Sequence, residues 1–455
     1  MDKTMSIGKK GHNYRVQQVY SINKSQERKF MSFYVLIIAC LFYSMGSFGL
    51  LNIFGVRRLV QSFLIISVLP LTIIIIARFQ ILIKSPLFLL LLVFVFAELI
   101  FERSSMVLLD NCTAIIVIGL LLSINREYSN KILKYIIIIC CVFSIMSIIQ
   151  AVIVFFRPDI IPFLSPNYTS ISETERIILQ HPLGVLGFTV FRGEVYLFGR
   201  IFTRFVSFAA EPSVLVYSFL VPGILALSFK GNIRYCSIPI LFFSIFLSQS
   251  GTIWLSVSFG VVSWVMFQFL KGKARFVSII PFFIIVLIFT FLSQTEISVF
   301  VKSIMGKLGS LPEHYSALYK YSSGNARLES IVYAFRLSKQ YILMGAPFIP
   351  ELTGVGFLLI LTISAGFIGL SLGIIVFYRI FKLSVSCFSL YKGITGLMAA
   401  LLFGTLFQIL LFSHYGWNRF PGLLMITLLM CRLEILIINK TEEDLISVKV
   451  SNGVI

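Results

Sequence analysis

The chain has 455 residues, of which 58% are hydrophobic and only 13% are charged. This composition excludes an ordinary soluble globular protein, because the polar side chains are too few for a water-exposed surface. The formal net charge is +19, which would point to nucleic acid in a soluble protein. In a membrane protein the same charge has another origin, namely the orientation of the chain in the bilayer.

Apolar stretches of roughly 17–25 residues, the length that crosses the hydrocarbon core as a helix, recur along the whole sequence. The first of them has no small-residue cleavage site behind it, so we interpret it as a retained span. We predict an all-α polytopic integral membrane protein with about 12 transmembrane helices. The predicted spans are 33–53, 59–77, 86–101, 105–124, 134–156, 212–229, 235–249, 252–270, 276–294, 354–378, 394–413 and 421–438.

Two places in this series leave alternatives open. The stretch SQSGT (248–252) could be a tight turn outside the membrane or a re-entrant break. The region 86–124 could cross once or twice, because charged residues crowd its middle: Glu98, Glu102, Arg103 and Asp110. Charged residues inside a membrane are functional candidates by default, which makes Glu98 and Asp110 worth locating.

Basic residues divide unevenly between the two sides of the membrane. The short loops on the same side of the membrane as the N-terminus carry Arg78, Lys84, Arg126, Lys131, Lys134, Lys230, Arg234, Lys271, Lys273, Arg275, Arg379, Lys382 and Lys392. Those on the other side carry Arg57, Arg58, Arg103 and Arg419. By the positive-inside rule both termini are cytoplasmic, and the basic loops attract anionic lipid head groups. This explains the net charge without nucleic acid as a partner.

The spans divide the chain into seven parts, of which two are long extracytoplasmic segments. The parts are a basic cytoplasmic N-terminal segment (1–32), helices one to five (33–156), a first long outside segment (157–211), helices six to nine (212–294), a second long outside segment (295–353), helices ten to twelve (354–438) and a cytoplasmic tail (439–455). Connections of this length are usually functional when they are ordered.

The first outside segment contains arginine but no lysine. Its arginines are Arg157, Arg176, Arg192, Arg200 and Arg204. A guanidinium pairs with phosphate through two parallel hydrogen bonds and stays charged at a membrane surface. The segment therefore predicts a site for a phosphate-bearing lipid head group; the alternative is lipid-facing arginines with local ion pairs.

The stretch RFVSFAAEPS (204–213) joins this segment to the sixth span. Pro212 suits the first turn of a helix, so Glu211 is expected at a helix N-terminus, where the helix dipole favours a carboxylate. A helical segment before it would place Arg204 and Arg200 one or more turns back. Glu211 is then either a structural cap with an ion pair, or a general base or acceptor-hydroxyl binder beside a phosphate clamp.

The second outside segment offers Arg327 and Arg336 as further phosphate ligands and His314 as a general base near neutral pH. His414 and Arg419 lie at the outer end of the eleventh span; they could bind substrate or serve as interfacial anchors. The glycines of GVGF (354–357) permit a close backbone approach where the tenth span begins, although helix packing alone would also explain them.

Four stretches in chain order resemble the bacterial O-antigen polymerase and ligase superfamily, especially the Wzy-type polymerases. They are RFVSFAAEPS (204–213), SQSGTIWL (248–255), NARLES (325–330) and GVGF (354–357). The resemblance covers roughly residues 200–360 and extends through the span count and the two long outside segments.

The resemblance implies glycosyl transfer at the outer face of the bacterial inner membrane. The donor would be a glycan on undecaprenyl pyrophosphate, and the acceptor would be the next lipid-linked repeat. Arg204 and Arg327 would hold the pyrophosphate, and Glu211 would be a base or would orient the acceptor. No cofactor or metal is expected. A chain-length regulator and a flippase of the same pathway are possible partners.

Two alternatives differ in the step they perform. An O-antigen ligase would transfer finished glycan to lipid A-core, but Tyr315 after His314 and the position of Gly324 depart from the ligase pattern. A flippase or transporter for the same lipid-linked repeats would have similar composition, although its outside loops would usually be short. A non-catalytic subunit of such an assembly also fits the composition.

Overall fold

The computed structural model of the chain describes eleven stretches, together with a few single positions before residue 85. They are residues 85–101, 105–123, 126–156, 194–197, 200–203, 216–248, 251–269, 333–346, 355–391, 393–412 and 420–451. The predicted spans 33–53, 59–77 and 276–294 lie essentially outside these residues.

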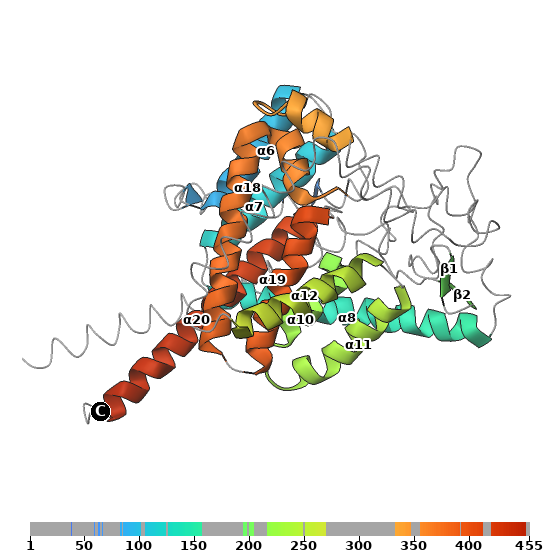
Figure 1. Cartoon of the computed structure of the whole chain (residues 1–455), viewed down its shortest axis with the longest axis vertical. Coiled ribbons are helices and arrows are strands. Elements are labelled where there is room, and N and C mark those ends of the chain that lie inside the picture. Colours follow the sequence, from blue (N-terminus) through green and yellow to red (C-terminus); the bar gives the residue numbers. More distant parts are fainter. Residues whose placement is uncertain are drawn as a thin grey trace, which may run out of the picture.

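The described chain is mainly helical (Figure 1). Its long helices are α6 (Pro86–Phe101), α7 (Ser105–Ser123), α8 (Arg126–Phe156), α11 (Asn232–Ser248), α12 (Gly251–Phe269), α18 (Phe357–Leu390), α19 (Ile394–Phe412) and α20 (Phe420–Ser451). Apolar runs adopt helices in lipid because a helix satisfies its own backbone hydrogen bonds. Eight predicted spans therefore coincide with helices, and the separate α6 and α7 show that 86–124 forms two.

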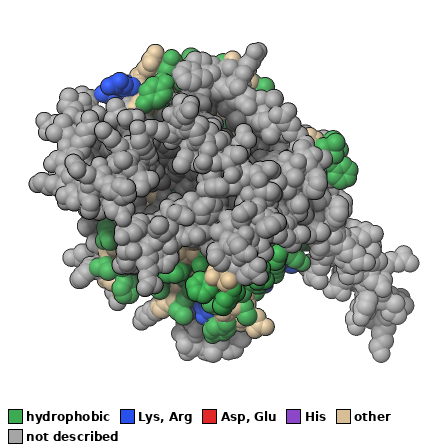
Figure 2. Space-filling view, turned by 90° about the vertical axis from the view of Figure 1, so that its right-hand side faces the viewer, with side chains coloured by type: hydrophobic (Ala, Val, Ile, Leu, Met, Phe, Trp, Pro, Cys, Tyr) green, Lys and Arg blue, Asp and Glu red, His purple; other side chains and the backbone are tan. Residues whose placement is uncertain are grey.

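Three of these helices contain stretches long and apolar enough to cross a membrane: Tyr128–Ile153, Phe357–Leu390 and Gly422–Ile446. The other apolar helices found by the same criteria are shorter. Along α8 an exposed stripe is entirely aliphatic and recurs at helical spacing, at Ile138, Val142, Ile145, Ile149 and Val152. On the face of the molecule shown in Figure 2, the described side chains that reach the surface are likewise mainly hydrophobic. Both features are typical of helices that contact lipid.

The first outside segment contains a β-hairpin that the all-α prediction did not include. Strand β1 (Glu194–Leu197) pairs antiparallel with β2 (Arg200–Thr203), with Glu194 opposite Thr203 and Leu197 opposite Arg200. The helical alternative for this region is therefore wrong at residues 200–203. Extended backbone rises more than 3 Å per residue, so Arg200 does not lie on a helical turn leading to Glu211.

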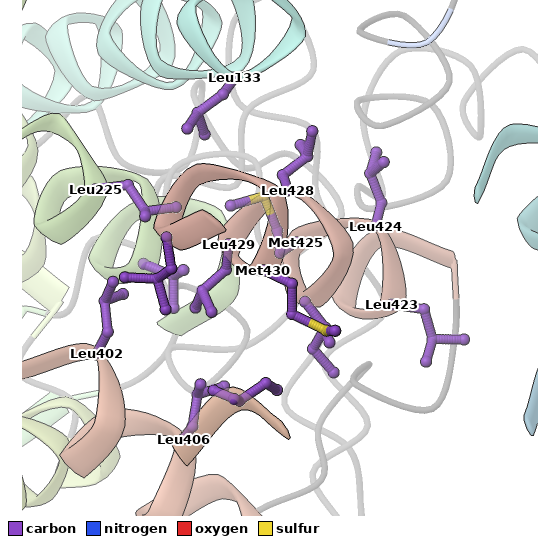
Figure 3. Packing of buried hydrophobic residues seen from close by; sticks show 14 of the residues in the cluster. Leu133, Leu225, Leu402, Leu406, Leu423, Leu424, Met425, Leu428, Leu429 and Met430 are labelled. Carbon is purple, nitrogen blue, oxygen red and sulfur yellow. The ribbon is translucent and has the colours of Figure 1, made fainter. Parts of the chain in front are cut away.

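Helix α20 occupies the centre of the core (Figure 3). Leu424, Leu428 and Leu429 of α20 are fully buried, and the same cluster includes Leu133 of α8, Leu225 of the short helix α10 (Val221–Ala226) and Leu402 of α19. Burial of a leucine side chain stabilises by about 1.5–3 kcal/mol in water; within lipid the equivalent gain comes from close packing. The core therefore brings together helices that are far apart in sequence.

Helices α12 and α19 pack backbone against backbone. Gly260 and Gly404 face one another so closely that a Cβ on Gly404 would collide with Gly260. Nearby, the Ser256 hydroxyl donates a hydrogen bond to Oε1 of Gln408 at 2.8 Å, and both side chains are buried. Small residues and interhelical hydrogen bonds are the usual means of helix association in membranes.

The predicted sixth span begins, within the described residues, with a π-helical turn. Residues Val216–Leu220 form this turn, η5, which continues into α10. Pro222 has no N–H to donate to the Ser218 carbonyl in an α-helical pattern. The thiol of Cys140 on α8 donates to that carbonyl instead, at 2.8 Å. The proline thus leaves the Ser218 carbonyl without its usual backbone donor, and a side chain of the neighbouring helix α8 takes that place.

This arrangement predicts coupling between Cys140 and Pro222. Cys140→Ala should lower the free energy of unfolding by about 1 kcal/mol, because a buried carbonyl loses its donor. In a Pro222→Ala background the restored N–H can take that carbonyl, so the additional cost of Cys140→Ala should fall to less than about half. A double-mutant cycle of unfolding in mixed micelles measures the difference. Equal costs in both backgrounds would show that the thiol does not act as this donor.

Candidate functional site

The C-terminal part of the second outside segment packs against the beginning of α18. Residues 333–340 are helical and are followed by a turn that ends at Ala346. Ala334, Leu337 and Ala346 are buried against Val355, Ile360 and Ile363, which form a small hydrophobic cluster separate from the main core. The end of this segment is therefore a fixed part of the membrane domain.

Helix α18 is interrupted where this turn reaches it. Ala365 has φ −141° and ψ 17°, and Gly366 has φ 61° and ψ −152°, so the helix breaks between two helical parts. The conformation of Gly366 is essentially restricted to glycine. The Ala346 N–H donates to the Ile363 carbonyl at 2.7 Å, which fastens the turn to the last residues of the first helical part.

The two backbones approach closely at the interruption. A Cβ on Gly345 would lie 2.8 Å from the Ser364 carbonyl oxygen, and one on Gly366 would collide with the backbone of Leu343 and lie 2.8 Å from Met344 N. The Ser364 side chain is buried, and its hydroxyl has no hydrogen-bond partner among the described residues. Interrupted helices at membrane depth are tolerated where protein or a polar cavity satisfies the backbone, and they recur at substrate sites.

Arg336 is the one predicted site residue whose side chain the structure describes. It is exposed, as are Tyr333 and Lys339, on the helical segment whose other side carries the buried Ala334 and Leu337. This places a guanidinium at the surface of the docked segment, where it is available to an anionic ligand.

The structure does not describe the side chains of the other predicted site residues. The backbone of Arg200 lies in β2. The others fall outside the described residues: Arg192, Arg204, Glu211, His314, Arg327, His414 and Arg419. Glu98 and Asp110 lie on α6 and α7, but their side chains are likewise not described. Helix α18 begins at Phe357, the last residue of GVGF (354–357), close to the start of the tenth span predicted at 354.

A buried polar network at the other end of α18 and α20 was missed by the sequence analysis. Arg432 of α20 donates from Nε to the Ser228 hydroxyl at 2.8 Å, from Nη2 to the Ser228 carbonyl at 2.8 Å and from Nη1 to Oδ1 of Asn130 at 3.1 Å. Its guanidinium carbon lies 4.1 Å from the ring centroid of Phe229. The available signal was a lone arginine in the apolar run LLMCRLEIL (428–436).

Two further contacts join the segments at this end. Nη2 of Arg379 lies 2.7 Å from Oε1 of Glu434, and the Tyr391 hydroxyl donates to the Leu436 carbonyl at 2.7 Å. Burial, the largest cause, raises the pKa of Tyr391, so the phenol retains the proton that it donates. The segments 126–134, 227–234 and 379–391, all predicted to lie at or near one side of the membrane, are therefore linked to one helix, α20.

Within the described stretches, no three His, Cys, Asp or Glu side chains gather into a group that could hold a metal ion. A comparison of the sequence with protein-family models finds no match, and a comparison with curated proteins finds none either.

Proposed function

We propose that the chain is a membrane glycosyltransferase that polymerises oligosaccharide repeats carried on undecaprenyl pyrophosphate. The observation that carries the proposal is the docking of the second outside segment on the interrupted α18. This docked stretch lies between NARLES (325–330) and GVGF (354–357), two of the four stretches that resemble the Wzy-type polymerases. A helical architecture with apolar, membrane-length helices agrees with the same proposal.

The proposed reaction needs only side chains of this protein. A hydroxyl of the acceptor repeat attacks the anomeric carbon of the donor glycan, and the bond from that carbon to the pyrophosphate oxygen breaks. Glu211 accepts the hydroxyl proton, while Arg204 and Arg327 stabilise the charge that develops on the pyrophosphate leaving group. Arg336, at the surface of the docked segment, would bind the same charged group or guide it inward.

The proposal places the reaction at the outer face of the bacterial inner membrane, with both termini cytoplasmic. The end of the molecule that contains Arg432 and Tyr391 would then face the cytoplasm. The docked segment 333–346 would lie at the opposite, outer side, which agrees with the distribution of basic residues among the short loops.

The test is complementation of a strain that lacks this chain. Arg204→Ala, Glu211→Ala and Arg327→Ala should each reduce the polymer ladder at least about tenfold at matched membrane levels, because each removes a group that acts on the transition state. Arg176→Ala is the matched control, since this arginine lies in the same outside segment but outside the four stretches. A full ladder from all three variants would contradict the assigned roles.

A deletion strain separates the alternatives by the product that accumulates. Single repeats on the lipid core indicate a missing polymerase. Bare core together with long lipid-linked polymer indicates a missing ligase, and repeats retained on the cytoplasmic face indicate a missing flippase. Either of the last two outcomes would overturn the proposed reaction.

A further inference from the structure

Four basic side chains lie at one short turn between α10 and α11, and a fifth, Lys131, lies one helical turn before Lys134 on α8. The turn comprises residues 227–231 and leads into α11 at Asn232. The basic side chains come from three parts of the chain, namely Lys131 and Lys134 of α8, Lys230 and Arg234 at the turn itself, and Arg432 of α20.

Phe229 holds two of these cations in place. Its buried ring lies 4.1 Å from the guanidinium carbon of Arg432 and 5.6 Å from Nζ of Lys134. The face of an aromatic ring attracts a cation but carries no opposite charge that would neutralise it. Two basic side chains therefore lie beside one ring without a carboxylate of the described residues between them and it.

The turn is also fastened by Arg234, which donates from Nε and Nη2 to the Leu227 carbonyl at 3.0 and 2.6 Å. Like the acceptors of Arg432, this carbonyl is neutral. Lys131 lies 5.2 Å from the ring centroid of Tyr128, again a neutral partner. The contacts described for Lys131, Lys134, Arg234 and Arg432 are thus all with uncharged groups.

Of the carboxylates described on α20, Glu434 pairs with Arg379, whereas Glu443 and Asp444 pair with Lys440. Positive charges that lie close together repel one another, and an anion bound among them reduces this repulsion. Lys131, Lys134 and Lys230 are exposed, so an anion in the surroundings can reach them.

The cluster lies where a helix of membrane-crossing length and a shorter apolar helix begin. Lys131 and Lys134 occupy the first two turns of the stretch Tyr128–Ile153, and Arg234 occupies the first turn of the apolar helix Asn232–Ser248. Helix ends of this kind lie at the depth of lipid phosphates, and basic pockets between such helices bind anionic head groups. The exposed aliphatic stripe of α8 continues from this cluster along the same helix.

We infer that the turn 227–231, with Lys131, Lys134, Lys230 and Arg234 around it, binds the phosphate of one anionic phospholipid. The acyl chains of that lipid lie along α8, and the buried Arg432 fixes the turn from within. This inference does not depend on the proposed polymerase reaction, because none of these residues belongs to the site proposed for glycosyl transfer.

The test is a titration of the purified full-length chain with phosphatidylglycerol, followed by thermal unfolding. A lipid that binds the folded chain raises the midpoint of unfolding, and the stabilisation grows with the logarithm of one plus its concentration over Kd. The double variant Lys134→Gln/Lys230→Gln should bind the lipid about 25-fold more weakly, since each lysine near the surface contributes a factor of about five. The exposed Lys339→Gln, on the docked segment 333–346, is the control and should bind like the wild type.

Two parallel titrations identify the ligand. Phosphatidylcholine with the same acyl chains and inorganic phosphate should each raise the midpoint far less than phosphatidylglycerol does. Sodium chloride should weaken the binding of phosphatidylglycerol, because the contacts are ionic. The inference would be overturned if the double variant bound phosphatidylglycerol less than about threefold more weakly than the wild type, or if the Lys339→Gln control lost as much affinity. It would also be overturned if phosphatidylcholine or inorganic phosphate stabilised the chain as much as phosphatidylglycerol does.

Discussion

Replacing Arg432 with alanine should lower the free energy of unfolding by roughly 3 kcal/mol, because three acceptors lose hydrogen bonds from a charged donor. The buried hydroxyl and carbonyl of Ser228 and the half-buried Oδ1 of Asn130 lose their guanidinium partner, and Phe229 loses its stacked cation. Removal of a desolvated charge offsets part of this cost. The three acceptors nevertheless belong to two segments, at Ser228 and Asn130, which Arg432 links to α20. The lost hydrogen bonds should therefore outweigh the gain from removing the buried charge.

Unfolding in mixed micelles measures this effect, and Arg379→Ala is the matched control. Arg379 also contacts α20, through Glu434, but its side chain is 43% exposed. An exposed ion pair contributes at most about 1 kcal/mol, so the control should be affected much less. Arg432→Lys should lose most of the same roughly 3 kcal/mol, because a lysine ammonium cannot reproduce the planar array of donors of a guanidinium. Equal effects of Arg432→Ala and Arg379→Ala would contradict a special role for the buried network.

Gly366→Ala should detach the docked segment 333–346 from α18. The substitution forces alanine into a conformation reserved for glycine, at a cost of about 1–3 kcal/mol, and adds a collision with the Leu343 backbone. A backbone cannot move aside as a flexible side chain can. The expected result is faster tryptic cleavage after Arg336 and Lys339, together with loss of the polymer ladder.

Gly393→Ala separates conformational strain from collision. Gly393 has φ 76°, but a Cβ there would meet nothing within 4 Å. Its alanine variant should therefore lose only about 1–2 kcal/mol, the cost of a left-handed conformation. Tryptic cleavage after Arg336 should stay at the wild-type rate in this variant. If Gly366→Ala were cleaved no faster than Gly393→Ala, the docking contact would not depend on Gly366.

The helices were largely predictable from apolar length, whereas the interruption of α18 was not. Runs such as 86–101 and 394–413 consist almost entirely of apolar residues, and the structure shows helices at nearly those bounds. Gly366 lies in the equally apolar run ISAGFIGL (363–370). Glycine is frequent in membrane helices, so its presence there does not signal a break. The break depends on a contact with a turn about twenty residues earlier.

Two features that were not predicted have recognisable signals in the sequence. In EVYLFGRIFT (194–203), two short runs rich in β-branched and aromatic residues flank Phe198 and Gly199, a pattern typical of a hairpin. Arg432 interrupts an apolar run, and such a charge must find polar partners in the folded protein. Those partners, Ser228 and Asn130, could not be predicted because they lie about 200 and 300 residues away.

The predicted glycosyl-transfer site remains a set of sequence predictions around one described residue. The roles of Arg204, Glu211 and Arg327 follow from the resemblance to the Wzy-type polymerases, and these residues lie outside the described part of the chain. Arg336 is exposed on the docked segment. Charged residues in long connecting segments follow no periodic pattern, so their mutual distances depend on tertiary contacts that local sequence patterns do not reveal.

The most direct test of the proposed reaction uses the purified chain in vesicles, supplied with one lipid-linked repeat and chelator but with no nucleotide. We expect a ladder of longer lipid-linked glycans, released undecaprenyl pyrophosphate in matching amount, and no ladder from Glu211→Ala. Repeats that stay unextended, while the wild-type chain moves them across the bilayer, would show that the chain is a transporter and not a polymerase.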